Sequence, residues 1–455
     1  MILGMSYKDY FKGKKVTVMR IGLLGRGIGD AAYMAEAGAQ VLVVDDASVE
    51  VMQPAVEALK DYPNITFKFG PYQNEDFGNR DFILVGAGAS LGLECLRYAI
   101  EDGVPLKQSA SLFAELAEVP IIGVTGTRGK STVTQMIYHT LSVVTGEKIL
   151  LGGNIRGVSN LQLLKEAKED SLCVMELDSW QLQGWGWAKL SPQIAVFTNF
   201  MEDHLNYYQK EGLDKKAAMR AYFADKANIF KYQKESDVLI TTPEVFEEAK
   251  TLPDVTLGQE VRLADESIIP EDCLLAMPGR HNRLNAALAY EALKAISLTD
   301  EEIFSGLASF AGVEGRLQLL KTVNNVRIYN DNNSTTPQAT IAALEALDLG
   351  NKNIILIAGG ADKGIELNEL VQSIGDHCRQ VILTPGSGTD RLLNIINGIK
   401  KPIVAEDLEK AFEEARLVAE NGDIILFSPA FASFGQYKNE YERNDEFVEL
   451  VNKYE

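Results

Sequence analysis

Short apolar runs alternate with amphipathic stretches along almost the whole chain. The first apolar run extends from Val16 to Gly25, a helix-like stretch follows, and a second run ends at Asp45 and Asp46. Alternation of this kind is typical of parallel strands covered by helices. It predicts an α/β fold that opens with a Rossmann-like βαβ unit.

A central group of apolar runs surrounds a glycine-rich segment. The run that ends at Thr125 leads into this segment, and a helix-like stretch follows it. Further strands are expected near Ser171, Gln193 and Asp237. This order predicts a parallel sheet of the P-loop ATPase type.

A last group of apolar runs begins close to Arg316. One of its helices is expected to end at Asn421 and Gly422, because Asn and Gly are common helix stops. We therefore expect three domains: a Rossmann-like N-terminal domain, a central ATP-binding domain and a Rossmann-like C-terminal domain. Their expected ranges are residues 1–118, 119–313 and 314–455.

The composition of the 455-residue chain is that of a globular protein, with 46% hydrophobic and 24% charged residues. A formal charge of −20 argues against general binding to nucleic acids or anionic membranes. No apolar run reaches the roughly 18 residues that cross a bilayer. The four cysteines lack metal or redox spacing, which fits a reducing compartment. We expect a cytoplasmic monomer that binds small molecules, without membrane insertion or a nucleic-acid partner.

The strongest chemical signal is the segment GVTGTRGKST, which follows a strand and opens a helix. Backbone N–H groups and a helix N-terminus hold phosphate oxygens in such a setting. Lys130 is expected to reach the β- and γ-phosphates of ATP, and Ser131 to hold magnesium. The glycines depart from the strict Walker pattern but match a recognised variant, T-G-T-x-G-K-S. The expected ATP contacts in this loop are Gly126, Thr127, Gly129, Lys130, Ser131 and Thr132.

Glycines also crowd the first strand-to-helix turn, at positions 22, 25, 27 and 29. They do not form a clean G-x-G-x-x-G pattern, so a nicotinamide site has weak support. Close packing of the helix against the strand explains such glycines equally well.

Nine further motifs follow the phosphate loop in order: GGNI (152–155), MELDSWQL (175–182), TNFMEDHL (198–205), AYFADKANIF (221–230), GRHNRLNAALA (279–289), GRL (315–317), YNDNNSTTPQAT (329–340), AGGADKG (358–364) and SPAFASFGQYKNEYERNDEF (428–447). In this order they resemble the motifs of the Mur ligases, the ATP-dependent amide-forming enzymes of peptidoglycan precursor synthesis. The resemblance covers the whole chain. Within the family it is greatest to the member that adds D-glutamate to UDP-N-acetylmuramoyl-L-alanine.

The resemblance implies that ATP phosphorylates the carboxylate of UDP-N-acetylmuramoyl-L-alanine, after which the amine of D-glutamate attacks the acyl phosphate. Two anions have to meet, so cations must be in place before the reaction. By resemblance, two magnesium ions would be held by Ser131, Glu176, His204 and Lys226, with Lys226 carbamylated by CO₂. The implied catalytic residues are Lys130, His204, Lys226 and Arg316. Without the resemblance, a lysine such as Lys226 is most often solvated on a helix surface.

The same resemblance implies the remaining contacts. The nucleotide would contact Asn282, Asn285, Arg316 and Asp331, although the two asparagines could instead cap a helix. The UDP-sugar would contact Gly25, Arg26, Gly27, Asp45 and Asn154. The amino-acid substrate would contact Thr335, Lys363 and Ser433.

The chain departs from the family pattern at several positions: Arg128 replaces Asn, residues 86–88 replace S-P-G, Asp178 replaces Ser, Gly315 replaces His, Asn333 replaces Lys and Glu440 replaces Phe. An acidic Glu440 would repel a dicarboxylate, so another amino-acid acceptor stays open. The sequence also leaves open a folylpolyglutamate synthetase-like or cyanophycin-type ligase, a nucleotide-binding oxidoreductase, and an ATP-binding regulator without turnover.

Overall fold

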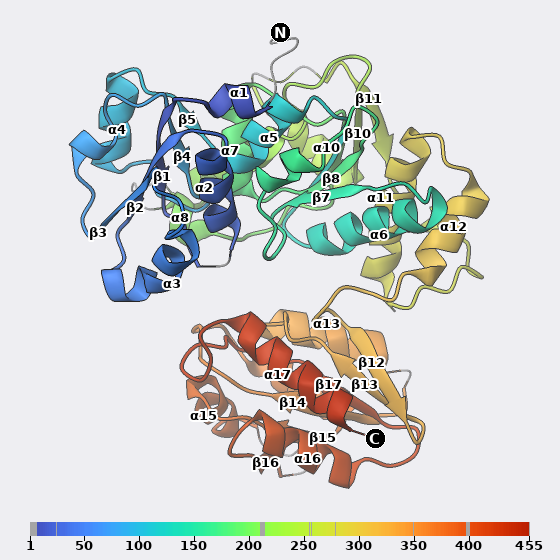
Figure 1. Cartoon of the computed structure of the whole chain (residues 1–455). Helices are drawn as coiled ribbons and strands as arrows, with labels where there is room; N and C mark the ends of the chain where they lie inside the picture. The colour runs from blue at the N-terminus through green and yellow to red at the C-terminus, as the bar shows by residue number, and fades with distance from the viewer. Residues whose placement is uncertain are drawn as a thin grey trace. The chain divides into compact units, whose positions relative to one another are not determined.

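Figure 1 shows the computed structural model of the chain, which describes residues 7–23, 25–209, 214–253, 255, 257–277, 279–348, 350–396 and 401–454. Three sheets follow one another along the sequence, and helices cover the faces of each. This confirms the predicted α/β class. The chain divides into two compact units: Met1–Ile268 with Asn285–Gly306, and Ile269–Leu284 with Leu307–Glu455.

The first sheet has five parallel strands in the order β3-β2-β1-β4-β5. The strands are β1 (Lys15–Met19), β2 (Gln40–Asp45), β3 (Ile65–Phe69), β4 (Phe82–Val85) and β5 (Leu106–Lys107). The helices are α1 (Tyr7–Phe11), α2 (Arg26–Glu36), α3 (Val49–Leu59), η1 (Asn74–Asp76), α4 (Glu94–Glu101) and α5 (Ser109–Ala117). The strand order reverses between β1 and β4, which is where doubly wound sheets bind ligands. The predicted Rossmann-like opening is therefore confirmed.

The second sheet has six parallel strands in the order β11-β10-β9-β6-β8-β7. The strands are β6 (Ile121–Thr125), β7 (Leu150–Gly153), β8 (Cys173–Glu176), β9 (Ile194–Phe197), β10 (Val238–Thr241) and β11 (Glu260–Leu263). The helices of this part of the chain are α6 (Lys130–Val144), η2 (Gln162–Lys165), α7 (Ser179–Ala188), α8 (Leu205–Tyr208), α9 (Lys215–Ala227), α10 (Pro243–Ala249), η3 (Glu266–Ile268), α11 (Arg280–Ala295) and α12 (Asp300–Ser309). Strand β6 is central and fully buried, so the loop that follows it emerges in the middle of the sheet edge.

One hydrophobic core contains side chains of both the first and the second sheet, Val18 and Met175 among them. Polar contacts add to this packing: the Asp30 carboxylate on α2 accepts hydrogen bonds from the Ser159 hydroxyl at 2.6 Å and the Leu161 N–H at 3.0 Å. The first two sheets thus lie in one compact unit. Each predicted domain contains one sheet, and the boundaries between them stay a prediction.

The third sheet has six strands in the order β12-β13-β17-β14-β15-β16, in which only the edge strand β12 is antiparallel to its neighbour. The strands are β12 (Gln318–Val323), β13 (Val326–Asn330), β14 (Ile354–Ala358), β15 (Cys378–Leu383), β16 (Ile403–Val404) and β17 (Ile424–Phe427). The helices are α13 (Pro337–Leu347), α14 (Asn368–His377), α15 (Ser387–Leu393), α16 (Leu408–Val418) and α17 (Glu440–Lys453).

The predicted end of α16 is wrong by three residues. The helix ends at Val418, and the next residue, Ala419, already has an extended ψ of 136°. The Asp423 carboxylate accepts a hydrogen bond from the Glu420 N–H at 2.7 Å, which forms a turn before β17. Gly422, with a φ of 93°, serves this turn and not the helix terminus.

The cysteines and the membrane prediction can also be compared with the structure. All four cysteines are buried and free. Burial raises the pKa of the Cys173 thiol, so this side chain packs as a small apolar group. Within the described ranges, no helix combines the length and the apolar character needed to cross a bilayer.

Candidate active site

The glycine-rich loop joins β6 to α6. Gly126 has a φ of 144° and Gly129, the N-cap of α6, has a φ of 81°, both in the region that favours glycine. A Cβ at Gly126 would lie 1.9 Å from the Thr198 hydroxyl oxygen, and one at Gly129 would lie 2.5 Å from the Asn285 amide oxygen. Both glycines are therefore required by backbone conformation and by close packing. The loop opens α6, whose N-terminus supplies N–H groups for an anion.

Asn199, the second residue after β9, holds the loop in place. Its side-chain oxygen accepts from the Arg128 N–H at 2.9 Å, and its side-chain nitrogen donates to the Arg128 carbonyl at 3.1 Å. Its own carbonyl accepts from the Thr127 N–H at 2.9 Å, and the Thr127 hydroxyl accepts from the Met201 N–H at 3.0 Å. Contacts within the protein thus define the shape of the loop. Asn199 was not predicted from the sequence, although its place just beyond the end of a strand is a usable signal.

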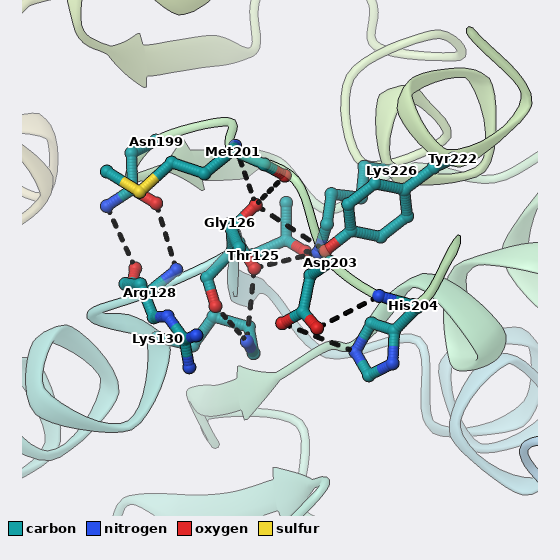
Figure 2. A network of polar contacts seen from close by, with 11 residues as sticks. Thr125, Gly126, Arg128, Lys130, Asn199, Met201, Asp203, His204, Tyr222 and Lys226 are labelled. Atoms are coloured by element: carbon teal, nitrogen blue, oxygen red, sulfur yellow. Dashed lines mark hydrogen bonds and ion pairs between the residues drawn. The ribbon is translucent and has the colours of Figure 1, made fainter. Parts of the chain in front are cut away.

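Two lysine amines converge on the carbonyl oxygen of Gly126 (Figure 2). The Nζ of Lys130 donates to it at 3.0 Å and to the Thr127 carbonyl at 3.2 Å. The Nζ of Lys226, on α9, donates to the same Gly126 oxygen at 2.7 Å and lies 4.9 Å from the centre of the Tyr222 ring. The loop therefore presents two amines together.

Lys226 is only 1% exposed, so the interpretation as a solvated surface lysine is wrong. Burial, followed by the positive charge of Lys130, holds the pKa of Lys226 well below its usual value. Asp178, Asp203 and Asp225 oppose this shift. Lowering the pKa enlarges the neutral fraction of the amine, which is its nucleophilic form.

Glu176 ends β8 and is 5% exposed. Strand β8 pairs with β6, so the carboxylate lies at the same sheet edge as the loop. Its Oε1 accepts from the Asn154 side-chain nitrogen at 3.3 Å, which orients it. Ser131, in the first turn of α6, adds a hydroxyl oxygen next to Lys130.

This set of oxygen donors fits magnesium, which binds through one or two protein oxygens together with phosphate oxygens. In the part of the chain that the structure describes, no three His, Cys, Asp or Glu side chains gather into a cage of protein ligands alone. Ser131 and Glu176 are the candidate oxygen ligands at the loop. Phosphate oxygens of a nucleotide would complete the coordination of the magnesium ion.

His204 precedes α8 and has a φ of 52°, a strained value for a residue with a side chain. The imidazole ring packs on Trp180, with the ring centres 4.6 Å apart. The backbone N–H of His204 donates to the Asp203 carboxylate at 2.9 Å. Burial lowers the pKa of His204, and the positive charges of Lys130 and Lys226 lower it as well. The negative charge of Asp203 has the opposite effect. The imidazole is therefore largely neutral at pH 7, the form that binds metals.

The first strand-to-helix turn borders a pocket at the point where the strand order reverses, lined by Arg20, Gly22, Arg26 and Gly27 among others. A Cβ at Gly27 would lie 2.2 Å from the Ile21 carbonyl oxygen, and one at Gly29 would lie 2.6 Å from the Ser159 side chain. Close packing therefore accounts for these two glycines.

Among the predicted UDP-sugar contacts, the structure brings Arg26 and Asn154 together, since Arg26 donates to the Asn154 side-chain oxygen. Gly25, with a φ of 89°, is the N-cap of α2 beside them. Asp45 lies at the end of β2 and its carboxylate accepts from the Ala47 N–H at 3.1 Å.

In the second unit, the three predicted amino-acid contacts follow three adjacent strands. Thr335 comes after β13, Ser433 after β17 and Lys363 after β14, and these strands are neighbours in that order. The Nζ of Lys363 donates to the Thr335 hydroxyl at 3.0 Å. The structure thus brings two of the three into direct contact, and the third, Ser433, is buried.

Asp331 also lies at this edge and is 4% exposed. Its carboxylate accepts from the Leu317 N–H at 3.1 Å and from the Ser428 hydroxyl at 2.8 Å. Burial raises its pKa to about 6, against these hydrogen bonds and the charge of Arg316. Arg316 itself is exposed.

The two asparagines predicted to contact adenine lie on α11 and are buried: Asn282 is 1% and Asn285 is 7% exposed. Neither is the N-cap, because α11 begins at Arg280. The interpretation that they cap this helix is therefore wrong.

Two family models match the chain: the Mur ligase middle domain over residues 124–293, and the Mur ligase, glutamate ligase domain over residues 315–431. The chain belongs to the Mur ligase family. The UDP-N-acetylmuramoylalanine--D-glutamate ligase of Geobacillus kaustophilus is 33% identical over 99% of this chain and 100% of its own length. The enzyme of the same name from a Roseiflexus species is 30% identical over 97% and 99%.

Solved structures of other Mur ligases share the fold. The MurC ligase of Thermotoga maritima has a TM-score of 0.58 at 19% identity, over 96% of this chain and 99% of its own. The MurF ligase of the same organism, in complex with ADP, has a TM-score of 0.58 at 17% identity, over 99% and 96%. These structures support the architecture of the chain.

Two departures of this Mur ligase from its family pattern fit one another. A Cβ at Gly315 would lie 3.1 Å from the side-chain nitrogen of Asn333 and 3.1 Å from the side-chain oxygen of Asn444. The Asn333 side chain donates to the Glu314 carbonyl at 3.1 Å, and its N–H donates to the Gly315 carbonyl at 2.9 Å. The glycine makes room for the asparagine, so the two replacements form one local exchange.

Two more departures have structural roles in this Mur ligase. The Asp178 carboxylate accepts from the Gln181 N–H at 2.7 Å and caps α7, as aspartate commonly does. A Cβ at Gly86 would lie 2.4 Å from the Arg20 carbonyl oxygen, so close packing requires a glycine there. Gly88 faces the Trp180 ring at 3.7 Å from its Cβ position.

Proposed function

We propose that this Mur ligase joins D-glutamate to UDP-N-acetylmuramoyl-L-alanine with consumption of ATP, in the synthesis of peptidoglycan precursors. Relatives that carry this activity in their names align with nearly the whole chain at 30–33% identity. The observation that carries the proposal is the meeting of Lys130 and Lys226 at the Gly126 carbonyl, in a preorganised phosphate loop.

The proposed chemistry has two steps. A carboxylate oxygen of the muramoyl-alanine attacks the γ-phosphorus of ATP and ADP leaves; the D-glutamate nitrogen then attacks the acyl carbon and phosphate leaves. In the first step two anions approach one another, so fixed cations supply most of the stabilisation. Lys130 would do this from the loop, and Arg316 is the candidate from the second unit.

Magnesium, when bound, would neutralise charge on the transferred phosphoryl group and the leaving ADP. Ser131 and Glu176 would hold one ion, and His204 with carbamylated Lys226 a second. The hydrogen bond from Asn154 supports this role of Glu176, because it orients the carboxylate at the loop.

Carbamylation of Lys226 is supported by its environment. The amine nitrogen would attack the carbon of CO₂ and lose a proton, which leaves a carbamate anion. The lowered pKa favours the neutral amine that reacts, and Lys130 nearby would stabilise the anion that forms. In ¹³CO₂-equilibrated protein, a carbamate carbon resonance that is lost in Lys226→Ala is the expected result.

The other ligand contacts are part of the proposal. The nucleotide would contact Asn282, Asn285, Arg316 and Asp331, and the UDP-sugar Gly25, Arg26, Gly27, Asp45 and Asn154. The amino acid would contact Thr335, Lys363 and Ser433. The charge of Arg443 acts on Glu440, the acidic residue at the position where the family has Phe. We also propose that the enzyme works as a cytoplasmic monomer with three domains.

A phosphate-release assay tests the function. Purified protein is given ATP, magnesium, UDP-N-acetylmuramoyl-L-alanine and one amino acid at a time, with D-glutamate, L-glutamate and D-aspartate compared. Release with D-glutamate, together with transfer of ¹⁸O from the labelled acid into phosphate, is expected. Release with another amino acid but not with D-glutamate would reject the proposed acceptor, and unlabelled phosphate would reject the acyl phosphate.

A further inference from the structure

A buried arginine on the last helix connects the loops that carry the proposed amino-acid contacts. Arg443 lies on α17 and is 4% exposed. Its Nε donates to the Asn332 side-chain oxygen at 2.8 Å and its Nη2 to the Asn332 carbonyl at 3.2 Å. Its Nη1 donates to the Phe431 carbonyl at 3.4 Å. Asn332 follows β13 and Phe431 follows β17, which are adjacent parallel strands.

The hydrogen bonds of the Arg443 guanidinium go to neutral oxygens and not to a carboxylate. Each of its three acceptors is neutral, and in the described ranges no ion pair forms to its guanidinium. Burial lowers its pKa to about 10, against the opposing influence of Tyr437 and of the charge of Glu440. A buried cation of this kind is costly, so the group is held by the planar fork of donors, which a lysine cannot reproduce.

The two loops are also joined to each other. The Ala430 N–H donates to the Ser334 carbonyl at 2.9 Å, next to Thr335. Ala430 has a φ of 63°, which is strained for a residue other than glycine and has to be held by its surroundings. Thr335 is three residues from Asn332 and Ser433 is two from Phe431, so the arginine fastens each loop close to a proposed contact.

We propose that Arg443 is a positioning residue for the amino-acid acceptor: it fixes Asn332 and Phe431, and through them the separation of the Thr335 and Ser433 hydroxyls. This inference rests on the proposed function, because it takes these hydroxyls as part of the acceptor site. Arg443 itself is covered by the loops and acts through them.

The neighbouring residue on α17 holds a different segment and supplies a matched comparison. The Asn444 side-chain nitrogen donates to the Glu314 carboxylate at 2.7 Å, and its oxygen accepts from Asn330 at 2.8 Å. Glu314 lies two residues before Arg316, which is one of the proposed nucleotide contacts. Loss of Asn444 should therefore affect ATP, and loss of Arg443 the amino acid.

The experiment compares Arg443→Lys, Arg443→Gln and Asn444→Ala with the wild-type enzyme. For the Arg443 variants the KM for the amino acid should rise about tenfold or more, while the KM values for ATP and the UDP-sugar stay within about twofold. For Asn444→Ala, the KM for ATP should rise instead. Arg416→Gln is the control, because its exposed guanidinium stacks on Tyr454 at 3.8 Å, away from both loops.

Hydrogen exchange gives a readout that needs no substrate. In Arg443→Gln, amides of residues 330–336 and 428–434 should exchange faster, while those of β14 keep their protection. Unchanged exchange of the two loops would overturn the proposal, as would equal rises in all three KM values. If the wild type ligates no amino acid, the proposed function fails, and exchange alone decides whether Arg443 fixes the loops. The Arg443→Lys variant keeps the positive charge and serves as the second test if Arg443→Gln does not fold.

Discussion

The amine of Lys226 donates a hydrogen bond to the carbonyl oxygen of Gly126 at 2.7 Å, although the two residues lie 100 positions apart in the sequence. The contact places a buried amine against the phosphate loop, on the side where Lys130 binds the same oxygen. The pKa of Lys226 is depressed because burial disfavours its charged form and because the positive charge of Lys130 lies close by.

Replacing Lys226 with alanine should lower ligation about a hundredfold or more, because the proposed metal-binding carbamate cannot form. Phosphate release is the measurement, and acetate or another small carboxylate should restore part of the rate. Lys216→Ala is the control, since Lys216 is exposed on the same helix, α9. A wild-type rate for Lys226→Ala without added carboxylate would exclude the carbamate.

Gly126→Ala should weaken nucleotide binding about tenfold or more, because its Cβ would collide with the Thr198 hydroxyl, 1.9 Å away, in a backbone region reserved for glycine. Gly146→Ala is the matched control: its φ is also positive, at 66°, but nothing lies within 4 Å of its Cβ position. It should cost only about 1 kcal/mol of stability, from backbone strain. Calorimetric titration with ADP and urea unfolding separate the two effects, and equal ADP affinities for both variants would argue against a preshaped loop.

Glu176→Gln should raise the magnesium concentration needed for half-maximal activity about tenfold or more, because one anionic ligand is lost. The amide can still accept the hydrogen bond from Asn154, so thermal stability should change little. Manganese binding in the presence of a non-hydrolysable ATP analogue, followed by magnetic resonance, gives a second readout. Glu202→Gln serves as the control, since Glu202 is exposed and pairs with Lys215 at 2.5 Å. A parallel loss in that variant would mean that general surface charge sets metal affinity.

Asp331→Asn should change how stability depends on pH. The pKa of Asp331 is raised to about 6 by burial, so between its unfolded value and 6 the folded protein holds a proton that the unfolded chain releases. This stabilising contribution is complete below the unfolded pKa and is lost as pH rises through about 6. From pH 5 to pH 7 the wild type should therefore lose about 1 kcal/mol relative to the asparagine variant. Urea unfolding at both pH values measures this difference, and parallel curves would show that Asp331 is ionised throughout.

Local features explain what could be predicted from the sequence. The segment from Ile121 to Lys130 combines a buried apolar strand, two glycines with positive φ and a helix start, and each of these depends on residues close together in the chain. The order of apolar runs likewise predicts parallel sheets, because buried parallel strands are apolar on both faces. The end of α16 was missed, because the side chain of Asp423 forms a turn that Gly422 alone does not signal.

Other residues acquire their roles through distant contacts. Asn199 binds Arg128 of the phosphate loop, 71 positions away in the sequence. Arg443 binds Asn332 and Phe431, which lie 111 and 12 positions from it and follow two different strands. Asp30 contributes to packing two sheets into one unit through partners 129 and 131 positions away. A polar residue of this kind looks ordinary in the sequence, because its value depends on which acceptors the fold places around it.

The sequence by itself determined the α/β class, the order of strands and helices, and the phosphate loop with Lys130, because short-range periodicity and backbone conformation decide these features. Tertiary structure alone decided that Lys226 is buried beside Gly126, that Gly315 and Asn333 fit each other, and that Arg443 holds two loops. These depend on burial and hydrogen-bond geometry between distant segments, which exist only once the sheets have packed.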